Sequence, residues 1–302
     1  MLSPAKINLG LEVTHRRGTD GYHCLNSIFV PISFGDEITF APAQANRITT
    51  VNELPSGKRE GFEAVSERGD IRGNLLWKIL QACEPEMSGG VHVHLIKRIP
   101  TGAGLGGGSS NAGKLLDYVA KRHALSSDRA LAIAVEHGAD IPFFLKNEPM
   151  LVGGIGEVME PIQVGPAWGV VCIPPIAVET GGAYAALKRP LQEGYSLKSW
   201  SLLDEVIRRA VRDSDWNKAR VLRNDFEEIV FARHPELAHL KSFFLEHGAA
   251  YASLSGSGSA VYALIDSSRS SESVPASNAE ELSLLASREF PEYVFAPFRF
   301  LS

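Results

Sequence analysis

Apolar and polar side chains alternate over residues 6–14, and this alternation predicts the first strand of the protein. Successive side chains of a strand point to opposite faces, so one face of this strand is apolar. That face carries Ile7, Leu9, Leu11 and Val13. Lys6 and Asn8 share the other face, which makes a lysine inside an apolar segment the first candidate for chemistry.

Further strands are expected where short apolar runs are bounded by turn residues, at 25–32, 36–40, 91–99, 169–173, 251–255, 260–265 and 293–300. Helices are expected where apolar residues recur every three or four positions, at 75–83, 109–123, 127–138, 201–211, 220–231, 235–247 and 280–289. Residues 41–70 predict short strands with long turns, and 267–277 predict a mobile loop. Because strands and helices come in blocks, the predicted fold class is α+β.

The composition is that of a globular protein, with 302 residues of which 44% are hydrophobic and 22% are charged. This length favours two domains, and the Pro161, Gly165 and Pro166 cluster suggests a division into residues 1–163 and 164–302. A formal net charge of −5 and the absence of a basic stretch argue against a nucleic-acid partner.

Compartment and membrane association are also constrained by the sequence. No apolar run approaches the ~18 residues of a membrane span, and the start of the chain lacks the pattern of a targeting peptide. The three cysteines lie far apart and suit a reducing compartment, so we expect a cytoplasmic protein without a disulfide framework.

Glycines cluster directly after the strand predicted at 91–99, where Gly102 to Gly108 hold five glycines in seven positions. Glycine lets the backbone adopt positive φ and lets a ligand approach it closely. The helix that follows offers unpaired N–H donors and the positive end of its dipole. The segment therefore predicts an anion site, most simply for phosphate, although a flexible turn would also use glycine.

Two well-known phosphate-binding patterns fit this segment poorly. The dinucleotide fingerprint G-x-G-x-x-G matches Gly102, Gly104 and Gly107, but no strand leads to an acidic residue ~20 positions later. The P-loop pattern reaches Gly113-Lys114, but Leu115 stands where a serine or threonine would bind magnesium. We therefore set both aside.

Three segments resemble the GHMP kinase superfamily, which phosphorylates small hydroxyl-bearing metabolites. Residues 100–110 (PTGAGLGGGSS) resemble its phosphate loop, residues 3–13 (SPAKINLGLEV) its N-terminal motif, and residues 254–264 (LSGSGSAVYAL) its C-terminal glycine motif. The segments follow one another in the family's order over nearly the whole chain. The resemblance implies a two-domain kinase fold, with an N-terminal domain like ribosomal protein S5 domain 2 and a ferredoxin-like C-terminal domain.

Within the superfamily, three local features resemble the branch that acts on a cytidyl alcohol. They are RRGTDGYHCL (16–25), GLGGGSSNA (104–112) and HGADIPFF (137–144). DGYH is the discriminating piece, since homoserine and mevalonate kinases lack it. The resemblance implies phosphorylation of the 2-hydroxyl of 4-diphosphocytidyl-2-C-methyl-D-erythritol by ATP, in the non-mevalonate isoprenoid pathway. Gly113 and Lys114 depart from the small or apolar residues usual after SSNA.

Asp140 and Lys6 are the catalytic candidates. By resemblance, Asp140 deprotonates or orients the acceptor hydroxyl, whereas a residue of this type before Ile141-Pro142 could otherwise only cap a turn. We expected Pro142 to keep Ile141 out of helical geometry. Lys6, if paired with Asp140, would keep that carboxylate ionised, and a lysine reaching out from a strand edge is the alternative. Asn8 is expected to donate a hydrogen bond to the substrate or the base.

The resemblance also assigns the binding residues. Those expected at the nucleotide are Asn74, Lys97, Pro100, Gly102, Gly104, Leu105, Gly106, Gly107, Gly108, Ser109 and Ser110. Those expected at the alcohol are Asn8, Tyr22, His23, Asp140, Thr180, Tyr184, Gly256, Ser257 and Gly258. Tyr22 and His23 suit a cytidine because they offer an aromatic face and a ring nitrogen. Lys97 could equally be a surface charge on its strand.

Magnesium is expected with the nucleotide and without an assigned protein ligand, because His92 and His94 lack a third partner nearby in the sequence. The expected partners are therefore ATP and a cytidyl substrate, with no membrane, and the chain is expected to be a monomer or weak homodimer. Two alternatives stay open: another GHMP kinase of the homoserine or mevalonate type, and a non-catalytic sensor on the same scaffold.

Overall fold

The computed structural model describes residues 1–53, 74–195, 197, 200, 202–266 and 273–301. The chain forms two compact units whose segments are interleaved along the sequence. Unit 1 comprises Met1–Ala5, Gly35–Thr101 and Gly106–Asn147, and unit 2 comprises Lys6–Phe34, Gly102–Leu105 and Glu148–Ser302. The expected domain boundary between residues 163 and 164 would divide the chain into two continuous segments, whereas these units are built from alternating segments. That boundary stays a prediction.

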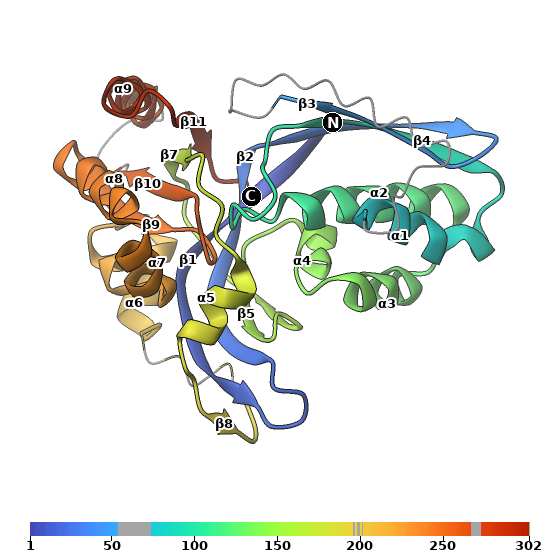
Figure 1. Cartoon of the computed structure of the whole chain (residues 1–302), viewed down its shortest axis with the longest axis horizontal. Coiled ribbons are helices and arrows are strands. Elements are labelled where there is room, and N and C mark those ends of the chain that lie inside the picture. The colour runs from blue at the N-terminus through green and yellow to red at the C-terminus, as the bar shows by residue number, and fades with distance from the viewer. Residues whose placement is uncertain (54–73, 196, 198–199, 201, 267–272, 302) are drawn as a thin grey trace. The chain divides into compact units, whose positions relative to one another are not determined.

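Unit 1 is a layer of strands with helices on one side (Figure 1). Its strands are β3 (Arg47–Asn52), β4 (Gly90–Lys97) and the second half of β2 (His23–Ala43). β4 pairs antiparallel with β2 and parallel with β3. Its helices are α1 (Leu75–Cys83), η1 (Glu84–Glu86), α2 (Gly107–His123), α3 (Ser127–His137) and α4 (Ile141–Lys146).

The core of unit 1 follows from the spacing of apolar residues in the sequence. In α1, Leu76, Ile79, Leu80 and Cys83 recur at helical spacing and are buried against β4 and α2, as their periodicity predicts. Gly113, which departs from the pattern expected after SSNA, has a packing reason. A Cβ at this position of α2 would lie 2.9 Å from Cβ of Phe144 in α4, so only glycine allows the two helices to approach.

Unit 2 contains a four-stranded antiparallel sheet in the order β11-β7-β10-β9 (Figure 1). The strands are β7 (Trp168–Ile173), β9 (Ala249–Leu254), β10 (Val261–Ile265) and β11 (Val294–Arg299). Residues of α7 (Phe226–Arg233), α8 (Pro235–Glu246) and α9 (Ser273–Glu289) share one apolar core with this sheet. Burial of such a core is the main driving force for folding.

Unit 2 also contains the first half of β2 and several further strands and helices. They are β1 (Leu2–Arg17, from Lys6 onward), β5 (Met150–Gly154), β6 (Val158–Pro161), β8 (Leu191–Gln192), α5 (Thr180–Ala186), α6 (Glu205–Arg212) and η3 (Lys218–Val221). β5 pairs antiparallel with β2 and β6, and β8 pairs parallel with the end of β1. Leu11 of β1 also bridges to Asn224, which precedes α7.

Several expected elements differ from the observed ones. The strands expected at 25–32 and 36–40 form one strand, β2. Helix α4 begins at Ile141 although Pro142 follows, because proline is tolerated in the first turn, so the expectation that Ile141 leaves helical geometry is wrong. The sequence reading missed α5, β5 and β6, and α7 begins six residues later than expected, at Phe226. Most of the loop expected at 267–277 lies outside the described residues, and α9 already begins at Ser273.

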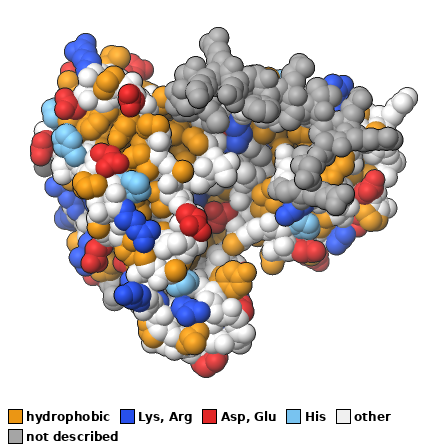
Figure 2. All heavy atoms as spheres, viewed as in Figure 1, with side chains coloured by type: hydrophobic (Ala, Val, Ile, Leu, Met, Phe, Trp, Pro, Cys, Tyr) orange, Lys and Arg blue, Asp and Glu red, His pale blue; other side chains and the backbone are white. Residues whose placement is uncertain are grey.

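Charged side chains are mixed on the surface. On the face drawn in Figure 2, Lys and Arg are interspersed with Asp and Glu over the coloured parts. Within the described residues, no helix is both long and apolar enough to cross a membrane.

Candidate active site

The first turn of α2 in unit 1 presents its backbone without a side-chain cap. Its N-cap residue, Gly106, has a left-handed φ of 69°, which glycine adopts at low cost, and has no side chain that could accept a hydrogen bond from the turn. A Cβ on Gly107 would lie 2.8 Å from Cβ of Ile99, whereas a Cβ on Gly108 would meet nothing within 4 Å. Gly107 is thus required for packing, and Gly108 leaves open space where N–H groups could receive an anion.

The two serines after the glycines have different surroundings. Ser110 is fully buried, and its Oγ lies 2.8 Å from Oγ of Ser3. Ser109 is only partly buried. Of the two predicted ligands, Ser109 therefore has the more accessible hydroxyl, and Ser110 ties the helix to the N-terminal strand.

Asp36 is a structural residue of unit 1 that the sequence reading missed. Its carboxylate is fully buried and accepts hydrogen bonds from Lys97 Nζ at 2.7 Å and from Asn111 Nδ2 at 2.7 Å. It also accepts from the backbone N–H groups of Arg98 at 2.7 Å and Ile99 at 2.8 Å. The available signal was an aspartate beginning an otherwise apolar strand, since a buried carboxylate needs such partners.

This arrangement changes the interpretation of Lys97. The sequence reading placed it beside the loop as a cation for phosphate, and the structure pairs its ammonium with Asp36. Asp36 connects residues 97–99, which precede the glycines, with Asn111, which follows them. The carboxylate therefore holds both ends of the glycine segment within unit 1.

Asp140 stands at the N-cap position of α4, with φ −86° and ψ −11°, and makes no side-chain capping hydrogen bond. The alternative explanation of this residue as a helix cap therefore loses its basis. Asn74, in contrast, is a true cap, since its Oδ1 accepts from Leu76 N at 2.9 Å. Its predicted contact with the nucleotide stays a prediction.

In unit 2, Lys6 is almost fully buried, with 4% of its surface exposed. Its Nζ donates to Asn8 Oδ1 at 2.7 Å and lies 4.7 Å from the centre of the Phe29 ring. Its backbone N–H donates to Leu105 O at 3.0 Å, which fixes the strand beside residues 102–105. The alternative of a lysine reaching out from a strand edge does not fit this burial.

Asn8 connects Lys6 with the C-terminal glycine motif. The side chain is fully buried, and its Oδ1 also accepts from Gly256 N at 2.9 Å, while Nδ2 donates to Ser27 Oγ at 2.9 Å. The expectation that Asn8 donates a hydrogen bond to the substrate or the base stays a prediction. Its observed hydrogen bonds connect Lys6, Ser27 and Gly256.

The C-terminal glycine motif packs tightly on residues 102–105 of the same unit. A Cβ on Gly104 would lie 1.9 Å from Ser255 O, and Ser255 Oγ donates to Gly104 O at 3.0 Å. Ala260 N donates to Ala103 O at 3.1 Å. Gly256 and Gly258 have left-handed φ of 57° and 88°, and Ser257 Oγ lies 3.0 Å from Thr180 Oγ1.

An aromatic pair stands elsewhere in unit 2. The rings of His23 and Tyr184 have centroids 5.0 Å apart, and the Tyr184 ring in turn packs edge-on against Phe226 at 4.8 Å. Burial lowers the pKa of His23 below its usual 6.5, with further lowering by Arg16 and Arg189, so the imidazole is neutral at pH 7. Tyr22, which precedes His23 in the sequence, is largely exposed. These residues could hold a planar heterocycle.

The two histidines considered as metal ligands have other partners. His92 Nε2 and His94 Nδ1 lie 3.1 Å and 3.0 Å from the hydroxyl of Thr49 on the neighbouring strand. Within the described part of the chain, no three His, Cys, Asp or Glu residues gather as a metal-binding group would require.

Two family models match this chain. The GHMP kinases N terminal domain model matches residues 74–148, and the GHMP kinases C terminal model matches residues 205–283. The chain belongs to the GHMP kinases, and it is an ATP-dependent small-molecule kinase with the α+β two-domain fold of that family.

Its curated relatives narrow the group further. A 4-diphosphocytidyl-2-C-methyl-D-erythritol kinase from Leptospira interrogans is 40% identical, with 99% of this chain and 100% of the relative covered. One of the same name from Porphyromonas gingivalis is 38% identical over 86% of this chain and 89% of the relative.

Solved structures show the same fold. A crystal structure of 4-(cytidine 5'-diphospho)-2C-methyl-D-erythritol kinase matches with a TM-score of 0.75 and 30% identity, covering 100% of this chain and 99% of that one. A homoserine kinase from Cytophaga hutchinsonii matches with a TM-score of 0.65 but only 17% identity, over 100% of this chain and 95% of that one, which shows a shared fold alone.

Proposed function

We propose that this kinase transfers the γ-phosphoryl group of ATP to the 2-hydroxyl of 4-diphosphocytidyl-2-C-methyl-D-erythritol. The observation that carries the proposal is the pairing of His23 with Tyr184, 5.0 Å between ring centroids, at the DGYH motif. A neutral imidazole beside an aromatic ring can stack on a cytosine and exchange hydrogen bonds with its edge. A relative named 4-diphosphocytidyl-2-C-methyl-D-erythritol kinase, 40% identical over 99% of this chain, supports the same substrate.

Asp140 and Lys6 are proposed as the catalytic residues. The acceptor oxygen attacks the γ-phosphorus, the bond to the β-phosphate oxygen breaks, and Asp140 receives the proton of the hydroxyl. Its carboxylate makes no capping bond that this role would have to break. Lys6 supplies positive charge from a buried position, where an ammonium group acts more strongly than in water.

The nucleotide phosphates are proposed to bind at the glycine segment. The uncapped first turn of α2 and the open space at Gly108 fit an anionic group, and Ser109 can add a hydroxyl donor. Magnesium carried by ATP would neutralise charge on the transferred group, and no side chain is assigned to it.

Thr180, Ser257 and Tyr22 are proposed to contact the alcohol. A cytoplasmic location and a monomeric or weakly dimeric state also stay predictions.

The test is ADP release with a panel of alcohols. We expect turnover with the diphosphocytidyl alcohol and not with homoserine or mevalonate. Tyr184→Phe should retain KM for that alcohol within about threefold, and Tyr184→Ala should raise it about tenfold, because stacking on a base contributes about 1–3 kcal/mol. Turnover with homoserine or mevalonate and not with the diphosphocytidyl alcohol would refute the proposed substrate.

A further inference from the structure

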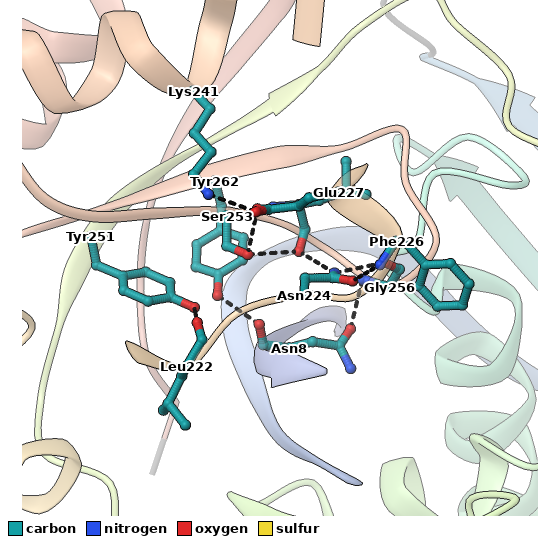
Figure 3. A network of polar contacts seen from close by, with 11 residues as sticks. Asn8, Leu222, Asn224, Phe226, Glu227, Lys241, Tyr251, Ser253, Gly256 and Tyr262 are labelled. Atoms are coloured by element: carbon teal, nitrogen blue, oxygen red, sulfur yellow. Dashed lines mark hydrogen bonds and ion pairs between the residues drawn. The ribbon is translucent and has the colours of Figure 1, made fainter. Parts of the chain in front are cut away.

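Asn224 is a buried amide whose two donor hydrogens and whose oxygen all bond to backbone groups. Its Nδ2 donates to Leu254 O and to Gly256 O, both at 2.8 Å, and its Oδ1 accepts from Phe226 N at 3.0 Å (Figure 3). Only 3% of the residue is exposed. An amide has two donor hydrogens, and here each one holds a carbonyl at the beginning of the C-terminal glycine motif.

Glu227, in the first turn of α7, bonds to Ser253 and Leu254 at the start of the C-terminal glycine motif. Its Oε1 accepts from Ser253 Oγ and from Leu254 N, both at 3.0 Å. Its Oε2 accepts from Lys241 Nζ of α8 at 2.7 Å, and Figure 3 shows this chain of contacts running from Lys241 to Ser253. Leu254 is therefore held through both its N–H and its C=O group, Gly256 through its C=O group and Ser253 through its hydroxyl.

The segment held in this way lies directly against the first half of the proposed nucleotide loop. Ser255 and Ala260 bond to the backbone of Gly104 and Ala103, and a Cβ on Gly104 would already lie 1.9 Å from Ser255 O. Contacts this close leave little free space, so a shift of the Ser255 backbone would displace Gly104.

Gly256 also connects the same segment to Lys6. Its N–H donates to Asn8 Oδ1 at 2.9 Å, and that oxygen also accepts from Lys6 Nζ at 2.7 Å. Tyr262 OH donates to Asn8 O at 2.6 Å, so the backbone of Asn8 is held as well. Asn224 thus lies two hydrogen-bonded steps from Asn8 and three from the lysine ammonium.

We propose that Asn224 is a positioning residue for nucleotide binding, acting through Leu254–Gly256 on residues 103–104. The three side-chain hydrogen bonds described for it go to Leu254, Gly256 and Phe226, and not to the proposed loop or to Lys6. An isosteric carboxylate at this position would set one negatively charged oxygen against two carbonyl oxygens now 2.8 Å from Nδ2, and the segment would have to move. The inference rests on the proposed nucleotide loop.

The experiment compares Asn224→Asp with Asn278→Asp, which makes the same change at an exposed position of α9. We expect Asn224→Asp to raise the Kd for ATP, measured by calorimetry without alcohol, by about tenfold or more. Asn278→Asp should match the wild type. Glu227→Gln, which keeps an acceptor for Leu254 N, should raise the Kd in the same direction by a smaller factor, and it carries the test if Asn224→Asp does not fold.

A purely structural role would reduce the active fraction, which lowers the apparent kcat but leaves Kd for ATP unchanged in the folded molecules. An unchanged Kd for ATP in both Asn224→Asp and Glu227→Gln would overturn the inference. Gly108→Ala tests the loop separately, because a Cβ at this position meets no atom within 4 Å. If it leaves ATP affinity intact, the proposed loop is wrong. If it weakens ATP binding and the Asn224 and Glu227 variants do not, only the positioning role fails.

Discussion

Oδ2 of Asp36 lies 2.7 Å from Nζ of Lys97, and the carboxylate is fully buried while the lysine side chain is 16% exposed. Lys97, which the sequence predicts to bind a phosphate, thus forms an ion pair with a carboxylate inside unit 1. The same carboxylate reaches Asn111 beyond the glycines, so this ion pair is part of the support of the loop.

Replacing Asp36 should therefore affect both stability and nucleotide binding. Asp36→Asn leaves Lys97 without its counter-charge and turns an amide toward backbone donors, which should cost about 3 kcal/mol of unfolding free energy. KM for ATP should rise more than KM for the alcohol. Denaturant unfolding and steady-state kinetics measure the two effects. Glu37→Gln, which removes a neighbouring carboxylate that is 48% exposed, is the matched control and should change neither by much.

Asp140 and Asp204 offer a comparison between a proposed base and a true helix cap. Asp140→Asn should lower kcat by about 10²–10⁴-fold, with ATP affinity retained, because a general base is lost. Asp204 accepts from Ile207 N at 2.9 Å, so Asp204→Ala should cost about 1 kcal/mol of stability and leave kcat unchanged. ADP release and thermal unfolding distinguish the two. Near-normal turnover of Asp140→Asn would remove this residue from the mechanism.

Adjacent glycines at the start of α2 should respond in opposite ways. Gly107→Ala places a methyl group 2.8 Å from Cβ of Ile99 and should destabilise the fold by about 1–3 kcal/mol. Gly108→Ala meets no atom within 4 Å and should leave stability unchanged. It should nevertheless weaken ATP binding, because its methyl group enters the space proposed for phosphate. Thermal unfolding and calorimetry test both, and wild-type ATP affinity in Gly108→Ala would place the phosphates elsewhere.

The pH dependence should report the state of His23. Because burial lowers its pKa below 6.5, the imidazole stays neutral to lower pH than a free histidine and becomes charged only as pH falls further. We expect kcat/KM for the alcohol to be constant from pH 8 to 6.5 and to fall below that, while KM for ATP changes less. His23→Gln should lose this acid limb. An apparent pKa above 6.5 in the wild type would contradict the assignment.

Local pattern predicted many elements and failed where context decides. The helix at 75–83 was predicted to the residue, since its apolar spacing and its Asn74 cap are properties of the chain itself. Helix α4 was missed because the proline rule used for Ile141 gives way when the proline lies in a first turn. The strands predicted at 25–32 and 36–40 are one strand, because pairing with β5 and β4 keeps β2 extended on both sides of residues 32–36.

The sequence alone determined the motifs, their order and hence the kinase class. Each glycine-rich loop and its flanking residues form one contiguous segment, so the residue types in that segment indicate its chemistry. Tertiary structure decided which of the named side chains are available. It buried Ser110 against Ser3, paired Lys97 with Asp36, and made Asn8 a connection between Lys6 and Gly256. Asn224 and Asp36 acquire their importance only from partners distant in the chain, which no local pattern records. The physical reason is that a buried polar group must find its hydrogen-bond partners, and folding alone determines which ones it meets.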